Sequence, residues 1–253
     1  MTREKRFEII QSELAKSGIV DGDDLAALLD VSRATIRRDF DALEEDGFLK
    51  RIHGGARAVE SLIELPYHSK MIAYMQEKRA IGHIVSGLIP DGSVIGCTGG
   101  TTVMAVVNHL KGKSITVVTN AINVAMELAP SEAVQVIVTG GSLRTRSYEL
   151  VGHIADRTLD ELHLDIALIG IDGLDPVQGL STYTLQEAHT GSLYVSHAEQ
   201  VWVIADHSKV GKIAPALIAP ITRVHKFFTD SGLSSILRSQ LEETGLEVII
   251  AEV

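Results

Sequence analysis

Residues 31–43 of the chain have the sequence VSRATIRRDFDAL. Apolar residues recur in it at the spacing of one helical face, at Ile36, Phe40 and Leu43. This periodicity predicts an amphipathic helix over about residues 33–46. Ser32 stands before it as a good N-cap, and Gly47 follows as a stop signal. The stretch therefore predicts a helix that buries one face and presents the other to solvent.

Two helices precede this one, the second of them short, and a hairpin follows it. The first helix is predicted by a stripe of apolar residues at helical spacing, Phe7, Ile10 and Leu14. Acidic residues open a second apolar run at 23–29, where carboxylates suit the positive end of a helix. Beyond the third helix, residues 48–52 and 56–59 flank His53-Gly54-Gly55, which is a hairpin signal. This order predicts a helix-turn-helix with a wing.

Basic side chains gather on the third helix and on the hairpin. At 100° per residue, Arg38 points away from the apolar stripe and is expected to meet base edges. The hairpin is expected to contact the adjacent phosphate backbone. A merely solvated helical face is the alternative, but helix, turn and hairpin together favour DNA binding. The candidate DNA-contacting residues are Ser32, Arg33, Thr35, Arg37, Arg38, Lys50, Arg51 and His53.

Composition limits the remaining possibilities. The chain has 253 residues, 45% of them hydrophobic and 22% charged, as expected of a folded globular protein. Its net charge of −10 confines any DNA contact to local basic patches. Cys97 is the single cysteine, and the histidines lack ligand spacing, so no disulfide, metal site or cofactor is expected. Without a long apolar run or a signal-peptide pattern, we expect a cytoplasmic protein with no membrane partner.

After Pro66 the pattern alternates between short β-branched runs and helical stretches. Continuous apolar strands that alternate with helices predict an α/β fold with a parallel sheet covered on both faces. We therefore expect a DNA-binding domain at 1–60, a linker at 61–76 and an α/β domain at 77–253. The expected strands are Ser93–Cys97, Ile115–Thr119, Val134–Thr139, Ile166–Ile171, Val201–Ala205, Lys226–Thr229 and Val248–Ala251.

Glycines and hydroxyl side chains follow several of these strands, where open α/β sheets bind ligands. The first such loop is Thr98-Gly99-Gly100-Thr101-Thr102, which precedes a helix. Its glycines permit close backbone approach and its hydroxyls donate hydrogen bonds, as an anion requires. A tight connection that simply needs glycine is the alternative. Other candidates at strand ends are Thr119, Asn120, Gly140, Gly141 and Asp172.

The segment from Asp24 to Ala56 closely resembles the signature of DeoR-family bacterial transcriptional regulators. The matching residues are Asp24-Leu25-Ala26, Val31 to Phe40, Leu43 to Gly47 and Arg51 to Ala56. The resemblance continues through most of the chain, and the form of the Thr98–Thr102 loop is similar to that of the AgaR-like branch. It implies a winged helix-turn-helix and a Rossmann-like sugar-phosphate-sensing domain similar in fold to ribose-5-phosphate isomerase.

The resemblance also implies function and partners. Family members are typically repressors of carbohydrate operons, which implies operator DNA, a phosphorylated sugar effector and a homo-oligomer, dimer or tetramer. The Thr98–Thr102 loop would hold the effector's phosphate, and Lys209 matches a lysine of the family's site. Arg144 lies in a segment similar to one that lines that site, and an anionic group or a subunit contact would suit it.

Two other functions stay open at this stage. Asp172, Glu187 and Lys209 resemble the acid and base set of a sugar-phosphate isomerase, which would make the chain an enzyme with an accessory DNA-binding domain. Glu187 is equally a favourable charge at a helix start. A DNA-binding module without an effector is the third possibility. The glycine-rich and hydroxyl-rich strand ends disfavour it.

Overall fold

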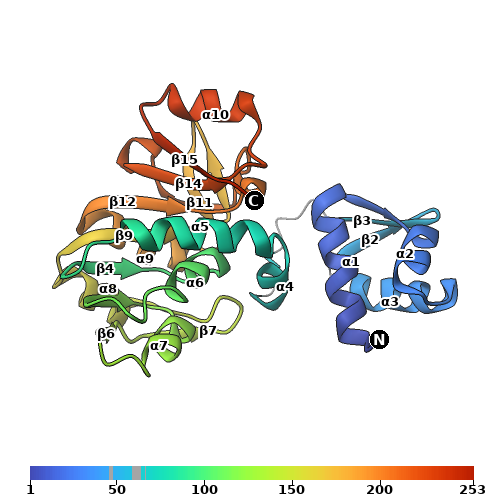
Figure 1. The fold of residues 1–253 in the computed structure, drawn as a ribbon, viewed down its shortest axis with the longest axis horizontal. Helices are drawn as coiled ribbons and strands as arrows, with labels where there is room; N and C mark the ends of the chain where they lie inside the picture. Colours follow the sequence, from blue (N-terminus) through green and yellow to red (C-terminus); the bar gives the residue numbers. More distant parts are fainter. Residues whose placement is uncertain (46–47, 59–63, 66) are drawn as a thin grey trace. The chain divides into compact units, whose positions relative to one another are not determined.

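The computed structural model describes residues 1–45, 48–58, 64–65 and 67–253. The chain forms two compact units, Met1–Tyr74 and Met75–Val253 (Figure 1). The division falls within the stretch expected to be a linker. Part of that stretch lies outside the described residues, and part forms helix α4 and the beginning of helix α5.

The first unit combines helices with a small antiparallel sheet of order β1-β3-β2. Strand β1 was not expected, because three residues are too few to show a period. The expected hairpin is formed by β2 and β3, although residue 59 at its end lies outside the described residues. The bounds are α1 Arg3–Ser17, β1 Ile19–Asp21, α2 Gly22–Leu29, α3 Arg33–Glu45, β2 Leu49–Ile52, β3 Gly55–Ala58 and α4 Tyr67–Ile72.

The core of this unit confirms the apolar stripes. Ile10 and Leu14 of α1 pack in one cluster with Ile36, Phe40 and Leu43 of α3. The helix ends also follow the sequence. Gly18 has a φ of +72° after α1, and the Ser32 hydroxyl accepts the Thr35 N–H at 3.1 Å before α3. Gly47, expected to end α3, lies outside the described residues.

The second unit is built on a seven-stranded sheet of order β15-β14-β12-β9-β4-β5-β6, in which every pairing is parallel. These are the seven expected strands. The helices and main-sheet strands are α5 Met75–Leu88, β4 Val94–Cys97, α6 Thr101–Val107, β5 Ile115–Thr119, α7 Ile122–Leu128, β6 Val134–Val138, α8 His153–Asp160, β9 Leu164–Gly170, α9 Leu185–Ser196, β12 Ala198–Ile204, η1 His207–Lys209, η2 Ile221–Arg223, β14 Lys226–Asp230, α10 Ser235–Glu242 and β15 Glu247–Ala251.

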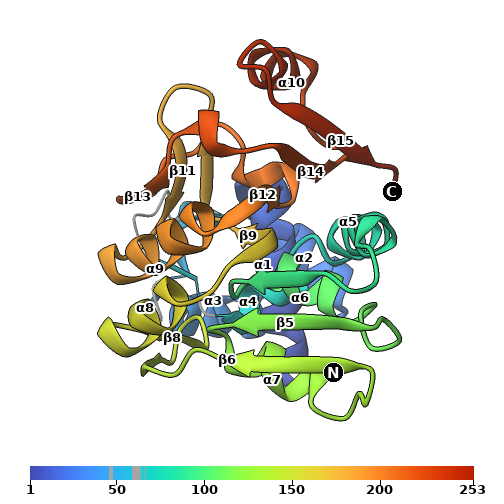
Figure 2. The ribbon, with the colours of Figure 1, turned by 90° about the vertical axis from the view of Figure 1, so that its left-hand side faces the viewer.

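Helices cover both faces of this sheet, as the continuous apolar strands predict. Successive residues of β12 serve two cores: Val203 packs with Tyr194 of α9, and Trp202 packs with Ile81 of α5. Figure 2 shows α8 and α9 on one side of the sheet and α5 and α6 on the other. The unit is thus a doubly covered α/β domain of the Rossmann-like class.

Two small additions were missed from the sequence. The hairpin of β7 (Ser142–Arg144) and β8 (Glu149–Val151) follows β6. The second is a sheet of β10 (Gly173–Asp175), β11 (Gly179–Thr182) and β13 (Ala216–Ala219). These strands have three or four residues each, too few for a clear alternation. Both additions lie next to the carboxyl ends of the main strands in sequence, where the candidate site is.

Candidate functional site

Helix α3 presents its basic face to solvent. Arg37 and Arg38 are exposed, and among the described residues neither forms an ion pair. Ser32 is exposed at the start of the helix, and its hydroxyl lies 2.9 Å from that of half-buried Thr35. The two arginines are therefore available to a DNA partner, with two hydroxyls at the helix end beside them.

A buried ion pair fixes α3 against α1. The Arg6 guanidinium donates to both carboxylate oxygens of Asp39, at 2.7 Å from Nε and 3.0 Å from Nη2. Asp39 is on the buried side of α3 and is only 2% exposed. A bidentate pair in this position sets the rotation of the helix that carries Arg38.

The wing offers basic groups of two kinds. Lys50 and His53 are exposed, and no ion pair involves either within the described parts of the chain. Arg51 instead pairs with Asp41 of α3, and its backbone N–H donates to Glu44 at 2.9 Å. Arg33 likewise pairs with Asp23. These two candidate DNA contacts therefore already have acidic partners.

In the second unit, the strand order reverses direction between β4 and β9. The chain runs outward from β4 to β5 and β6 on one side, and from β9 to β12, β14 and β15 on the other. The loops after β4 and β9 therefore diverge, which is where ligands bind in such sheets. The buried Thr98 hydroxyl links these strands, since it accepts the Gly170 N–H at 2.9 Å.

The loop after β4 already has an acidic partner. The Gly99 N–H donates to Oε1 of Glu149 at 2.5 Å, and a side chain on Gly99 would overlap that carboxylate. Gly100 has a φ of +105° and open space where a Cβ would be. Thr101 and Thr102 begin α6, the former half-buried and the latter buried.

The candidate residues after β5 and β6 mainly bond to the backbone or fix its conformation. The fully buried Thr119 hydroxyl donates to Cys97 O at 2.8 Å and accepts the Ala121 N–H at 3.0 Å. The Asn120 amide donates to Leu150 O at 3.2 Å, while its Oδ1 has no partner among the described residues. After β6, Gly140 and Gly141 have φ of +76° and +120°, so both need glycine.

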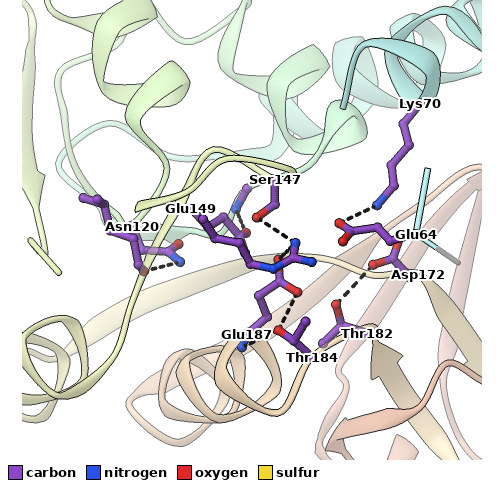
Figure 3. A network of polar contacts seen from close by, with 12 residues as sticks. Glu64, Lys70, Asn120, Ser147, Glu149, Asp172, Thr182, Thr184 and Glu187 are labelled. Atoms are coloured by element: carbon purple, nitrogen blue, oxygen red, sulfur yellow. Dashed lines mark hydrogen bonds and ion pairs between the residues drawn. The ribbon is translucent and has the colours of Figure 1, made fainter. Parts of the chain in front are cut away.

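Arg144, which is half-buried, forms an ion pair with buried Glu187. Nη1 of Arg144 lies 2.8 Å from Oε1 of Glu187 and donates to the Ser147 hydroxyl at 3.3 Å. The other Glu187 oxygen accepts the Thr184 hydroxyl at 2.8 Å at the start of α9. Figure 3 shows this network between Glu149 on one side and Asp172 on the other. Glu187 therefore both neutralises Arg144 and joins the cap of α9.

Acidic and basic side chains also pair beyond β9 and β12. Asp172 accepts the Thr182 hydroxyl at 3.1 Å and lies 3.7 Å from the Lys209 Nζ (Figure 3 labels the first pair). Behind them, Lys78 Nζ of α5 lies 3.7 Å from the carboxylate of Asp206. Burial lowers the pKa of Lys78 to about 8, against a partial opposing effect of Asp206.

Lys78, Glu149 and Lys212 are candidate site residues that sequence reasoning missed. A signal for Lys78 exists: it lies on the same stripe of α5 as buried Ile81 and Val85, where a lysine is unusual. Burial and the nearby Lys209 lower the pKa of Lys212 as well. The candidate edge therefore carries lysines drawn from separate segments of the chain.

Other chemistry is limited within the described part of the chain. No cluster of three or more histidine, cysteine or acidic side chains there has the arrangement of a metal site. Cys97 is fully buried, which raises the pKa of its thiol to about 12. None of the described helices has the length and apolar character that a membrane span needs.

Both units match known domain families. Residues 6–62 match the DeoR-like helix-turn-helix domain, and residues 74–231 match the DeoR C terminal sensor domain. A ribose 5-phosphate isomerase A from Methanocaldococcus jannaschii is a distant structural likeness. It is 18% identical, with a TM-score of 0.42 and coverage of 55% of each chain.

Several regulators are similar over nearly the whole chain. The HTH-type transcriptional repressor CsqR of Escherichia coli is 30% identical, covering 100% of this chain and 97% of that protein. The glycerol-3-phosphate regulon repressor of Escherichia coli is 32% identical over 91% of this chain and 92% of its own length. A putative aga operon transcriptional repressor of Escherichia coli O157:H7 is 32% identical, with coverage of 98% and 94%. The chain therefore belongs to the DeoR family of DNA-binding transcriptional regulators, which are not enzymes.

Proposed function

We propose that this regulator represses an operon of carbohydrate metabolism and leaves its operator when a phosphorylated sugar or sugar derivative binds the second unit. The observation that carries the proposal is the exposed pair Arg37 and Arg38, which α3 presents opposite its buried stripe. The repressor names of the similar regulators support the direction of control. We place the protein in the cytoplasm with its operator.

Each unit contributes a distinct set of contacts. Arg38 reads base edges, while Ser32, Thr35 and Arg37 contact phosphates or bases. Lys50 and His53 hold the wing against the adjacent backbone. Arg33 and Arg51 join them only when they leave Asp23 and Asp41. Because one helix-turn-helix reads few base pairs, the regulator acts as a homo-oligomer, a dimer or a tetramer, on repeated half-sites.

The effector occupies the carboxyl edge of the large sheet. Lys78 and Lys209 supply positive charge for its phosphate, together with the Thr98–Thr102 loop and Arg144. Asp172 and Asn120 accept hydrogen bonds from sugar hydroxyls. Thr119, Gly140 and Gly141 shape the backbone around it, and Glu187 orients Arg144.

A gel-shift experiment tests the proposal. Operator DNA is first selected by the full-length protein from a random-sequence pool. Phosphorylated sugars, each with its unphosphorylated counterpart, are then added to the complex. We expect release by one or more phosphorylated compounds and none by the free sugars. Selection of no preferred sequence, or equal release by both members of every pair, would contradict the proposal.

A further inference from the structure

Two donors expected to receive the effector's anionic group are already bound to carboxylates of the protein itself. The Gly99 N–H is held by Glu149, and the Arg144 guanidinium is held by Glu187 at 2.8 Å. Both carboxylates are buried, at 9% and 7% exposure. Each glutamate therefore stands where an incoming anion would have to bind.

A single hairpin carries one member of each pair. Arg144 and Glu149 face each other in the register of β7 and β8. Arg144 reaches across to α9, whereas Glu149 reaches the loop after β4, and Figure 3 shows Glu149 and Glu187 on the two sides of this network. Two of the contacts that fasten the hairpin are therefore ones that an anion disrupts. Backbone hydrogen bonds, from the Leu150 N–H to Asn120 O at 2.6 Å and from the Ile122 N–H to Tyr148 O at 3.0 Å, hold it as well.

We propose that Glu149 and Glu187 are internal competitors of the effector's anionic group, and that the effector releases the β7–β8 hairpin by displacing them. The inference rests on the proposed function and concerns the regulation of the same site. A neutral sugar has hydroxyl oxygens but no charge, so it competes weakly with a carboxylate for these donors. A phosphomonoester brings two charges and three acceptor oxygens, so it competes for either donor more strongly than one carboxylate does.

Neutralising the competitors should strengthen anion binding. In Glu149→Gln and Glu187→Gln, we expect the dissociation constant of inorganic phosphate, measured by titration calorimetry on the full chain, to fall about tenfold. The gain of Glu187→Gln should vanish in the double variant with Arg144→Gln, because the donor it frees is gone. Unchanged or weaker phosphate binding in both single variants would overturn the inference.

The matched control is Asp165→Asn. The Asp165 carboxylate accepts the Val94 N–H at 2.7 Å, as Glu149 accepts that of Gly99, but at the opposite, amino end of β4. Both substitutions remove one negative charge. Equal gains in phosphate affinity in Asp165→Asn and Glu149→Gln would therefore show an effect of net charge alone and would overturn the role of Glu149 as a competitor.

The unmodified chain gives an independent test. Phosphate should speed the hydrogen exchange of backbone amides in 142–151, because both side-chain contacts that hold the hairpin through Arg144 and Glu149 are lost. Unchanged exchange at saturating phosphate would overturn release of the hairpin.

The outcomes also distinguish this inference from the proposed function. If phosphorylated sugars release the operator from the wild type but the glutamine variants gain no phosphate affinity, this inference alone is overturned. If the glutamine variants bind phosphate more tightly but no phosphorylated sugar releases the operator, the proposed function is overturned instead. No phosphate binding by the wild type or any variant would overturn this inference.

Discussion

Arg38 and Lys50 are both exposed and basic, and we propose different DNA contacts for them. We expect Arg38→Ala to cost roughly 1–3 kcal/mol of operator binding and to lose sequence discrimination, as a bidentate base contact would. Lys50→Ala should weaken binding to every sequence and lower the salt slope by about 1. Gel shifts on operator and scrambled DNA at several salt concentrations separate the two effects. Unchanged operator affinity in both variants would remove α3 and the wing from the interface.

Lys78 should make effector binding depend on pH. Burial lowers its pKa to about 8, so this lysine loses its proton as the pH rises through that value. A phosphomonoester stays dianionic there, since its second pKa is about 6. Binding should therefore fall roughly tenfold between about pH 7 and 9 if the neutral amine contributes little.

The control for Lys78 is Lys78→Arg, whose guanidinium stays charged over this interval. Calorimetric titrations with a phosphorylated sugar should then give a flat profile. This variant also isolates Lys78 from Lys212, whose pKa is lowered in the same direction. A profile that keeps its full slope in Lys78→Arg would assign the effect to another group.

At the scale of the element, α3 depends on its anchor to α1. Asp39→Ala leaves the largely buried Arg6 guanidinium without its bidentate partner, and losing one member of a buried pair typically costs about 3–5 kcal/mol. We expect faster hydrogen exchange in α1 and α3 and weaker operator binding. Asp41→Ala is the control, because its exposed pair with Arg51 should contribute less than about 1 kcal/mol. Equal effects of the two substitutions would contradict the anchoring role.

The loop after β4 gives a second prediction at this scale. Gly100→Asp adds a negative charge to the loop proposed to hold phosphate, at a φ of +105°. The variant should still bind operator, because the winged helix is untouched, but phosphorylated sugar should no longer release it. Gly100→Ala carries the same backbone strain without the charge and should retain partial release. Normal release from Gly100→Asp in a gel shift would exclude this loop from the effector site.

At the scale of the whole molecule, the proposed DNA contacts and the proposed effector contacts fall in separate compact units. All the proposed effector contacts belong to Met75–Val253. A ligand at 100 times its dissociation constant should therefore raise the free energy of unfolding of that unit by about 2.7 kcal/mol. Thermal unfolding followed by hydrogen exchange should show this gain in residues 75–253 outside the β7–β8 hairpin and none in 1–58. Stabilisation confined to the first unit would place the effector elsewhere.

The sequence by itself determined the two kinds of architecture. The stripe of Ile36, Phe40 and Leu43, the cap at Ser32 and the seven apolar strands are local signals, because helix and strand periods are properties of neighbouring residues. The short strands β1, β7 and β8 were not predicted for the same reason, since three residues are too few to show a period. The exposed face with Arg37 and Arg38 also followed from helical geometry alone.

Only the tertiary structure decided which of the candidate groups are already paired. Gly99 and Glu149 are 50 residues apart, and Arg144 and Glu187 are 43 apart, so no local pattern connects them. The stripe of α5 marks Lys78 as unusual, but only the packing of that helix shows that it is buried beside Asp206. Burial, pairing and pKa depend on groups brought together from distant parts of the chain. The sequence can therefore predict which groups could donate hydrogen bonds to a ligand, but only the folded chain shows which of them already have partners.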